Sequence, residues 1–383
     1  MANYWFVSVP TSGSKQNTWQ NLKGKLKEAA EVTLYTVPEF KIGTLDALVL
    51  ISDELAKYDA SFESSANKLA DMLRNVSKDP NAGIDKSLVI NDRPVDQYIK
   101  TFEWNSMKYR TDKSLQEIAD ILNQEVISID NFMKSKMTNY SQVKSTLQSM
   151  QRKDTGNLAV KNLAGLVKKE YFVLGSEYLT TLLVAVPKNS AKDWQSKYES
   201  LTQMVVPRSS QKIAEDDDYG LWTVTLFKRV ADEFSNKCRE EKFIVRDFEY
   251  DENILALQKK DLAEVAATEK EQQQALSRLA KTNFSEVFQA WMHLKVLRVF
   301  VESVLRYGLP PDFAAMCIMP RPKMEKKTKE VLNENFGSLG GARGRIDNRS
   351  NSYDALEAEY EHLFDKNYYP YVFFEIGWDP SKR

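Results

Sequence analysis

A thin apolar stripe at helical spacing runs through residues 112–150 and limits what this chain can fold into more than any other feature. Its members recur in ten steps over 35 residues, a mean spacing of 3.5. They are Leu115, Ile118, Leu122, Val126, Ile129, Met133, Met137, Tyr140, Val143, Leu147 and Met150. A stripe this narrow is typical of a long helix that packs against one other helix. Such a long helix predicts an elongated molecule.

A second long helical segment is expected at 251–308, which has no proline and no internal glycine. Its first half is polar and its second half apolar, as in one helix, or two in line, that passes from solvent into a core. The end of this segment is FVESVLRYGLPPDF (300–313). Gly308 is placed to cap the helix and Pro310 and Pro311 to end it, while Arg306 suits the negative end of the helix dipole.

Both ends of the chain look like strands. YWFVSVP (4–10) and YYPYVFFEIGW (368–378) are rich in aromatic and β-branched residues. The simplest topology pairs them in one sheet. The intervening N-terminal elements are a helix after Ser14, a strand at 32–40 and a helix capped by Thr44. Toward the C-terminus, the pattern predicts helices around 322–336 and 353–364, separated by a glycine- and arginine-rich loop at 337–352.

In the middle of the chain, short strand and helix patterns alternate between the two long helical segments. This change of pattern predicts an inserted module at 156–260, within a larger domain formed by 1–155 and 261–383. Its expected order is β-α-β-β-α-β, typical of a small sheet with two helices on one face. The strands are expected at 178–187, 203–210, 221–227 and 242–250, and the helices at 192–202 and 228–241. The fold class is therefore predicted as α+β.

Composition excludes several classes of function. The 383 residues carry a net charge of −1, which gives no general reason to bind nucleic acid or an anionic membrane. No run approaches 18 consecutive apolar residues, and the first residues lack a basic signal-peptide region. Cys238 and Cys317 are expected to be reduced and buried. Phosphate-loop, serine-hydrolase and zinc-protease motifs are all missing, so we expect no active site, metal or cofactor.

Two short segments and one residue each allow a structural and a functional interpretation. The first, TSGSK (11–15), favours a helix cap over an anion site. The second is His293, which lies on an apolar helical face and is better explained as a core histidine than as a ligand. The third is the acidic run Glu215–Asp218, which suits a solvated loop more than a metal site.

A charged stripe lies along the predicted helix at 291–307. Lys295, Arg298, Glu302 and Arg306 fall within roughly 80° of one another on a helical wheel. Exposed i,i+4 pairs contribute only about 0.2–0.5 kcal/mol, so they do not explain the stripe by themselves. Three explanations stay open: the stripe is the solvated edge of the helix, its charges position the helix within the fold, or they face a partner.

Several long strings of the sequence resemble one family. They are FVESVLRYGLP (300–310), MVVPRSS (204–210), KFIVRDFEY (242–250), IGTLDALVLISDELAKYDA (42–60) and NYYPYVFFEI (367–376). In order and spacing they resemble the C subunit of the eukaryotic vacuolar-type proton ATPase, nearly end to end. The resemblance is weakest across 320–352.

The resemblance implies a dumbbell-shaped fold, in which a foot built from both chain ends joins a smaller head through long antiparallel helices. It also implies a non-catalytic stator component of the cytosolic sector, located in the cytoplasm and on the cytoplasmic face of vacuolar, endosomal or lysosomal membranes. The implied partners are the peripheral stalks, which are heterodimers of the E and G subunits, and the cytosolic N-terminal domain of the large membrane-bound a subunit. Release of the C subunit accompanies reversible separation of the two sectors.

Some members of the family bind actin or nucleotide, although no nucleotide motif is visible in this sequence. The rival hypothesis is an elongated adaptor, such as an actin-linked scaffold of another complex. Partner contacts are predicted at Val206, Pro207, Arg208 and Ser209, where the alternative is a simple turn, and at Arg298, Glu302 and Arg306. Trp194 and Tyr198, one helical turn apart, are expected in the core rather than at an interface.

Overall fold

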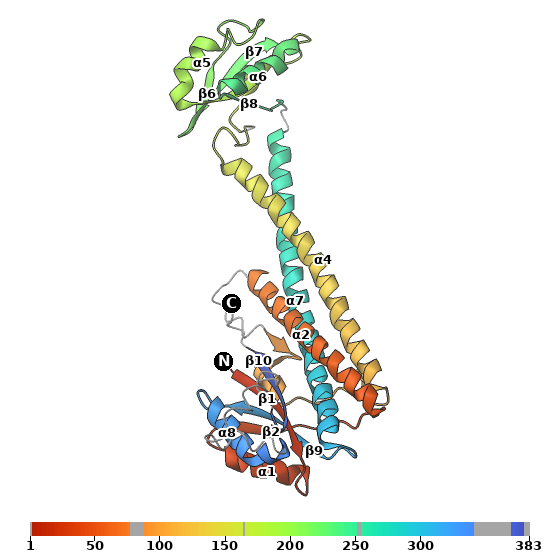
Figure 1. The fold of residues 1–383 in the computed structure, drawn as a ribbon. Helices are drawn as coiled ribbons and strands as arrows, with labels where there is room; N and C mark the ends of the chain where they lie inside the picture. The colour runs from red at the N-terminus through yellow and green to blue at the C-terminus, as the bar shows by residue number, and fades with distance from the viewer. Residues whose placement is uncertain (1, 77–87, 164, 251–253, 341–368, 379–383) are drawn as a thin grey trace, which may run out of the picture. The chain divides into compact units, whose positions relative to one another are not determined.

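The computed structural model describes residues 2–76, 88–163, 165–250, 254–340 and 369–378 (Figure 1). The chain divides into two compact units, described separately below. Unit 1 comprises Met1–Lys136 and Ala275–Arg383, and unit 2 comprises Met137–Gln274. Helices and antiparallel sheets occur in both units, which confirms the predicted α+β class. The dumbbell shape and the boundaries at 156–260 stay predictions.

Two long helices contribute residues to both units, and long helices were predicted in both of these segments. They are α4 (Leu115–Thr155), of 41 residues, and α7 (Ile254–Tyr307), of 54 residues. Within unit 1, Ile118, Leu122 and Val126 of the α4 stripe are buried. Within unit 2, the hydroxyl of Tyr140 on α4 donates to Glu269 Oε1 on α7 at 2.8 Å.

Unit 1 is built on a four-stranded antiparallel sheet. Its strands, in spatial order, are β10 (Val372–Trp378), β1 (Ala2–Pro10), β9 (Phe313–Pro320) and β2 (Ala30–Leu34). The pairing of β1 with β10 confirms that the two chain ends share one sheet. Helices α1 (Lys15–Leu26) and α8 (Glu325–Phe336) cover one face of the sheet. On the other face, Ser8 Oγ lies 2.6 Å from Ser303 Oγ of α7.

The remaining elements of unit 1 follow β2 and precede α4 in the sequence. They are α2 (Leu45–Val76), β3 (Val89–Ile90), β4 (Arg93–Pro94) and α3 (Val95–Lys100). The predicted caps are confirmed. Ser14 Oγ accepts the backbone N–H of Asn17, and Thr44 Oγ1 accepts that of Ala47. Gly308 takes the left-handed conformation that glycine allows, at φ 85°, directly after α7.

Two expectations for the unit 1 sheet were wrong. The strand predicted at 32–40 ends at Leu34. Tyr35 still bonds to Ala315 O, but Pro38 brings no N–H to a ladder. The central strand β9 was missed altogether. Its sequence, FAAMCIMP, is apolar on both faces and therefore lacks the alternation that marks a half-buried strand.

Unit 2 contains the predicted β-α-β-β-α-β order. The strands, in spatial order, are β6 (Lys212–Glu215), β7 (Tyr219–Phe227), β5 (Leu179–Pro187) and β8 (Ile244–Arg246). Helices α5 (Ala191–Lys197) and α6 (Ala231–Glu240) share one core with the sheet. The 3₁₀ turns of the described chain are Lys169–Tyr171, Lys188–Ser190, Lys228–Val230 and Gly337–Gly340.

The second strand of this module was predicted at 203–210, and that placement was wrong. The segment makes one bridge, from Val205 to Leu226, and then turns. Pro207 has no N–H to pair, and Arg208 has a φ of 60°, so pairing resumes only at β6. The helix predicted at 353–364, and all but the first residues of the loop at 337–352, lie outside the described residues.

Candidate partner-binding surfaces

The turn at Val206–Ser209 is held against strand β7 by backbone and hydroxyl groups. Val206 N donates to Thr225 O at 2.9 Å. Ser209 Oγ donates to Val206 O at 2.6 Å and accepts from Thr225 N at 3.1 Å. Because these bonds hold the peptide rather than a long flexible side chain, they favour one conformation of the turn.

Arg208 is presented by this turn in an unusual backbone conformation. Its φ of 60° lies in the left-handed region, which costs a non-glycine residue about 1–2 kcal/mol. Its N–H donates to Glu199 Oε1 at 2.9 Å, and the Tyr198 hydroxyl donates to the same oxygen at 2.8 Å. These two bonds, the one from Arg208 first, hold the pKa of the Glu199 carboxyl below its ordinary value. The side chain of Arg208 is exposed and forms no salt bridge among the described residues, although its charge also helps to lower the pKa of Glu199.

The neighbours of the turn are partly exposed and partly core. Pro207 is exposed, and Met204 keeps 42% of its surface accessible. The Arg229 guanidinium contacts Met204 Sδ, with Nε at 3.0 Å. Trp194, by contrast, is fully buried and donates from Nε1 to Ser210 Oγ at 2.9 Å. Tyr198 is also buried, which confirms the prediction that this aromatic pair belongs to the core.

The charged stripe of α7 meets a residue that sequence reasoning missed. Asp59 of α2 accepts Lys295 Nζ at 2.9 Å and Trp291 Nε1 at 2.6 Å, and it also pairs with Arg298. Lys295 is only 4% exposed, and burial holds the pKa of its ammonium below the ordinary value despite the opposing pull of Asp59. Lys295 and Arg298 therefore form ion pairs inside unit 1 instead of facing solvent with their charges unpaired.

A sequence signal for Asp59 did exist. The buried face of α2 carries apolar residues at helical spacing, including Leu55, Phe62 and Ala66. Asp59 lies four residues after Leu55 and three before Phe62, so it occupies this face. A buried acid calls for a paired cation, and the polar stripe of α7 was the nearest unexplained source.

Glu302 and Arg306 continue the stripe toward the end of α7. The Ser52 hydroxyl donates to Glu302 Oε1 at 2.7 Å, and Arg306 Nε lies 3.6 Å from Glu302 Oε2. Arg306 Nη1 also donates to Tyr369 O at 2.6 Å and to Tyr371 O at 3.1 Å. These contacts join α7 to α2 and to the chain entering β10. A contact of Arg298, Glu302 or Arg306 with a partner stays a prediction.

The other polar candidates are occupied by structural bonds. His293 is 1% exposed, with Nδ1 on Gln289 O at 2.6 Å and Nε2 accepting Asn105 N at 3.0 Å. Burial lowers its pKa to about 4, so the ring is neutral near pH 7. Asp216 of the acidic run accepts the backbone N–H groups of Asp218 and Tyr219 at 2.9 and 2.6 Å. Within the described ranges, no cluster of three or more acidic, histidine or cysteine side chains is arranged to hold a metal.

The two cysteines and the helices give two further findings. Cys238 and Cys317 are free and buried, and burial raises the pKa of each thiol to about 12. Both thiols are therefore protonated near neutral pH. Among the helices in the described parts of the chain, none combines the length and apolar character needed to cross a bilayer.

Comparison with known proteins shows a family across nearly the whole chain. The model of the V-ATPase C subunit family matches residues 4–372. Relatives include the V-type proton ATPase C subunit 1-A of Danio rerio, 42% identical over 379 residues that cover 98% of each chain. The V-type proton ATPase C subunit of Manduca sexta is 42% identical over 386 residues and covers 100% of each chain.

One solved structure, the cytoplasmic N-terminal domain of the V-ATPase I subunit, a homolog of the a subunit, aligns with 88% of this chain and 97% of its own. The TM-score is 0.33 and the identity 12%, which is too low to inform the fold. The sequence relatives, by contrast, match this chain over its whole length at an identity that shows common descent. The chain therefore belongs to the V-ATPase C subunit family.

Proposed function

We propose that this chain is a non-catalytic stator subunit in the cytosolic sector of the vacuolar-type proton pump. In this role it bridges the E–G peripheral stalks and the cytosolic N-terminal domain of the pump's a subunit, and its release controls reversible assembly of the two sectors. The observation that carries the proposal is the family match over residues 4–372, which leaves no large part of the chain for another role. The same family supports a location in the cytoplasm and on the cytoplasmic face of acidic endomembranes.

The two compact units support a bridging role. Each has its own sheet and its own buried cluster, centred on residues such as Trp5 and Val7 in unit 1 and Trp194 and Phe234 in unit 2. A separately packed unit keeps its shape while one of its surfaces is engaged, which a protein that bears load between two partners requires. Several moderate contacts also gain avidity together and release when their geometry changes, as reversible assembly requires.

In unit 2, the turn at Val206–Ser209 is the surface that we propose for the E–G stalk. It combines a fixed backbone with an exposed guanidinium. The fixed backbone of the turn loses little conformational freedom on binding, and the guanidinium can form bidentate bonds to a carboxylate. In unit 1, the partly exposed edge of Glu302 and Arg306 is the candidate contact for a second partner, with side-chain exposures of 25% and 32%.

Calorimetric titration of the full chain with a purified E–G heterodimer tests this function. We expect saturable binding, and no ATP hydrolysis by the chain alone. A flat titration under conditions in which the E–G heterodimer is folded would contradict the proposal. A pull-down that recovers actin and none of the pump subunits would favour an adaptor of another complex instead.

A further inference from the structure

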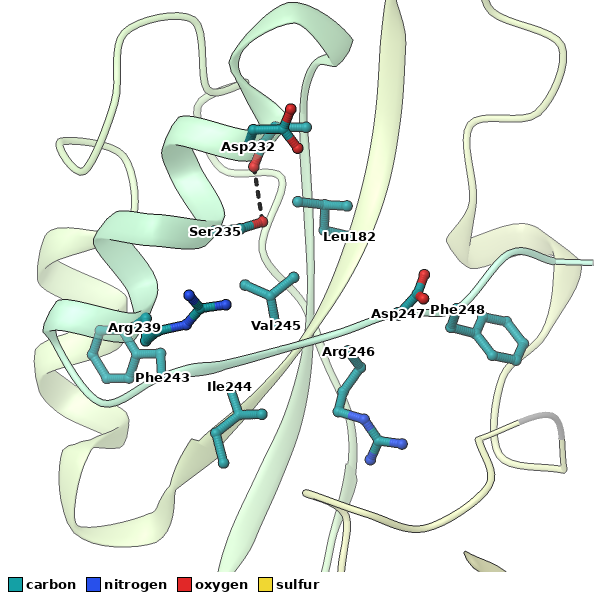
Figure 2. A pocket seen from close by; sticks show the side chains of 11 residues that line it. Leu182, Asp232, Ser235, Arg239, Phe243, Ile244, Val245, Arg246, Asp247 and Phe248 are labelled. Atoms are coloured by element: carbon teal, nitrogen blue, oxygen red, sulfur yellow. Dashed lines mark hydrogen bonds between the residues drawn. The ribbon is translucent and has the colours of Figure 1, made fainter.

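A hollow of about 470 Å³ opens in unit 2 between helix α6 and strand β8 (Figure 2). One wall is a face of α6 that carries Asp232, Ser235 and Arg239, spaced three and four residues apart. The other wall is the continuous run 243–248, which contains all of β8. Leu182 of β5 lines the hollow between them. Because every residue of the strand contributes, the hollow follows the strand lengthwise.

Strand β8 is the edge of its sheet. The spatial order is β6-β7-β5-β8, and Ile244–Arg246 pair only with Ala185–Leu183 of β5. Among the described residues, no backbone hydrogen bond joins these three residues to any group beyond β5. Such an edge offers N–H and C=O groups to a further strand. A groove between an edge strand and a helix suits an extended peptide, which takes its affinity from main-chain bonds.

The side chains at the two ends of the groove differ in charge. Arg239 lies beside Phe243, before the strand begins, whereas Asp247 lies just past its end (Figure 2). Asp232 adds a second carboxylate, at the start of α6. None of these three charged groups forms an ion pair within the described parts of the chain. The groove therefore has a positive end and a negative end with uncommitted charges.

Arg246 provides the contrast within the same groove. Its guanidinium donates to the carbonyl of Leu158 and, at 2.9 Å, to that of Lys161. It thus anchors the segment that precedes the sheet and is already used by the fold. The apolar surface available to a ligand comes from Leu182 and Val245, together with Ile244, which is 37% exposed.

We propose that β8 and α6 form a docking groove for an extended segment of a partner protein. The segment adds to the sheet antiparallel to β8, the more stable pairing, and places apolar side chains beside Val245 on the α6 side of the sheet. Its N-terminal end carries a basic residue that faces Asp232 and Asp247, and its C-terminal end an acidic residue that faces Arg239. This surface is separate from the Val206–Ser209 turn, and the inference does not depend on E–G binding.

Two capped peptides of identical composition probe the groove on the full-length chain. The matched peptide is Lys-Val-Thr-Val-Thr-Val-Glu, and the control Glu-Val-Thr-Val-Thr-Val-Lys reverses the charge order. Hydrogen exchange followed by mass spectrometry reports protection along 243–248, and fluorescence anisotropy gives the affinities. We expect the matched peptide to slow exchange in this run at least about fivefold and to bind about fivefold more tightly than the control, as one or two rim ion pairs allow.

A charge-swapped chain tests whether the side chains on α6 set the order. We expect Asp232→Lys with Arg239→Glu to abolish the preference for the matched peptide. Glu233→Lys is the matched control, because it changes an exposed acid in the same first turn of α6 but lies outside the hollow, and it keeps the preference.

Three outcomes would overturn the proposal. One is an unchanged exchange rate along 243–248 at millimolar peptide. Another is protection by both peptides that the charge swap leaves untouched. The third is concentration-dependent protection without peptide together with dimers in sedimentation equilibrium, which would assign the groove to a second copy of the chain.

Discussion

Asp59 in unit 1 and Glu199 in unit 2 both lie beside basic residues but bind different parts of them. Asp59 binds the cationic groups of Lys295 and Arg298. Glu199 binds the backbone N–H of Arg208 at 2.9 Å and leaves the guanidinium exposed. The first carboxylate closes a charged cluster, whereas the second fixes a backbone that displays a charge.

The difference shows that a charged stripe in a sequence does not by itself identify a partner surface. A cation whose charged side-chain group is bound by the nearest carboxylate is not available to a partner. A cation of which only the backbone N–H is bound stays available. Lys295, enclosed with Asp59, holds α7 against α2. The bond to Glu199 offsets the conformational cost of Arg208 and leaves its side chain available for binding.

The largest effect is expected from Asp59→Ala. This change leaves the Lys295 ammonium buried without its carboxylate and removes the acceptor of Trp291 Nε1. Loss of one member of a buried pair costs about 3–5 kcal/mol. Urea unfolding of the chain should show a loss of this size. Asp59→Asn keeps an oxygen for Trp291 but also removes the charge, so it should lose only slightly less than Asp59→Ala. A loss for Asp59→Asn much smaller than that for Asp59→Ala would show that charge pairing is not the main contribution.

A smaller loss is expected when the cation is removed as well. In the double variant Asp59→Ala with Lys295→Met, no buried ammonium remains, and an apolar side chain fills the space. Such replacements are often neutral or stabilising relative to the broken pair. We expect the double variant to regain at least about 1–2 kcal/mol over Asp59→Ala in the same unfolding measurement. Simple addition of the two single losses would argue against a closed cluster.

Much of the fold could be predicted from the sequence because its signals are local. The periodic stripe at 115–150 identified α4, and a long stretch without proline or internal glycine identified α7. The aromatic chain ends identified β1 and β10. Strand β9 was missed because FAAMCIMP, buried on both faces, has no alternation. The burial of Lys295 was missed because a helical wheel places it among polar residues, while its partner lies 236 residues away. For the same reason, proline could indicate the turn at 206–209 but not the Glu199 bond that fixes Arg208.

A moderate effect is expected from Glu302→Ala. Glu302 has contacts within the fold but is partly exposed, so it lies between the enclosed Asp59 cluster and the displayed charge of Arg208. The change removes the acceptor of the Ser52 hydroxyl and the partner of Arg306. Because Arg306 keeps its bonds to the carbonyls of Tyr369 and Tyr371, we expect a loss of only about 1 kcal/mol. Thermal unfolding measures it. Unchanged stability with weakened assembly on pump membranes would instead place Glu302 at an interface.

The smallest effect on stability, within about 0.5 kcal/mol, is expected from Arg208→Ala, because the variant keeps the backbone N–H that bonds to Glu199. Binding should respond differently. Loss of an exposed guanidinium on a fixed backbone should weaken E–G binding about tenfold in calorimetric titration. Glu199→Gln provides the matched test, because it retains the guanidinium but weakens the bond that fixes the turn. If Arg208→Ala leaves the E–G affinity unchanged, the turn is only structural, and the contrast between Asp59 and Glu199 has no bearing on binding.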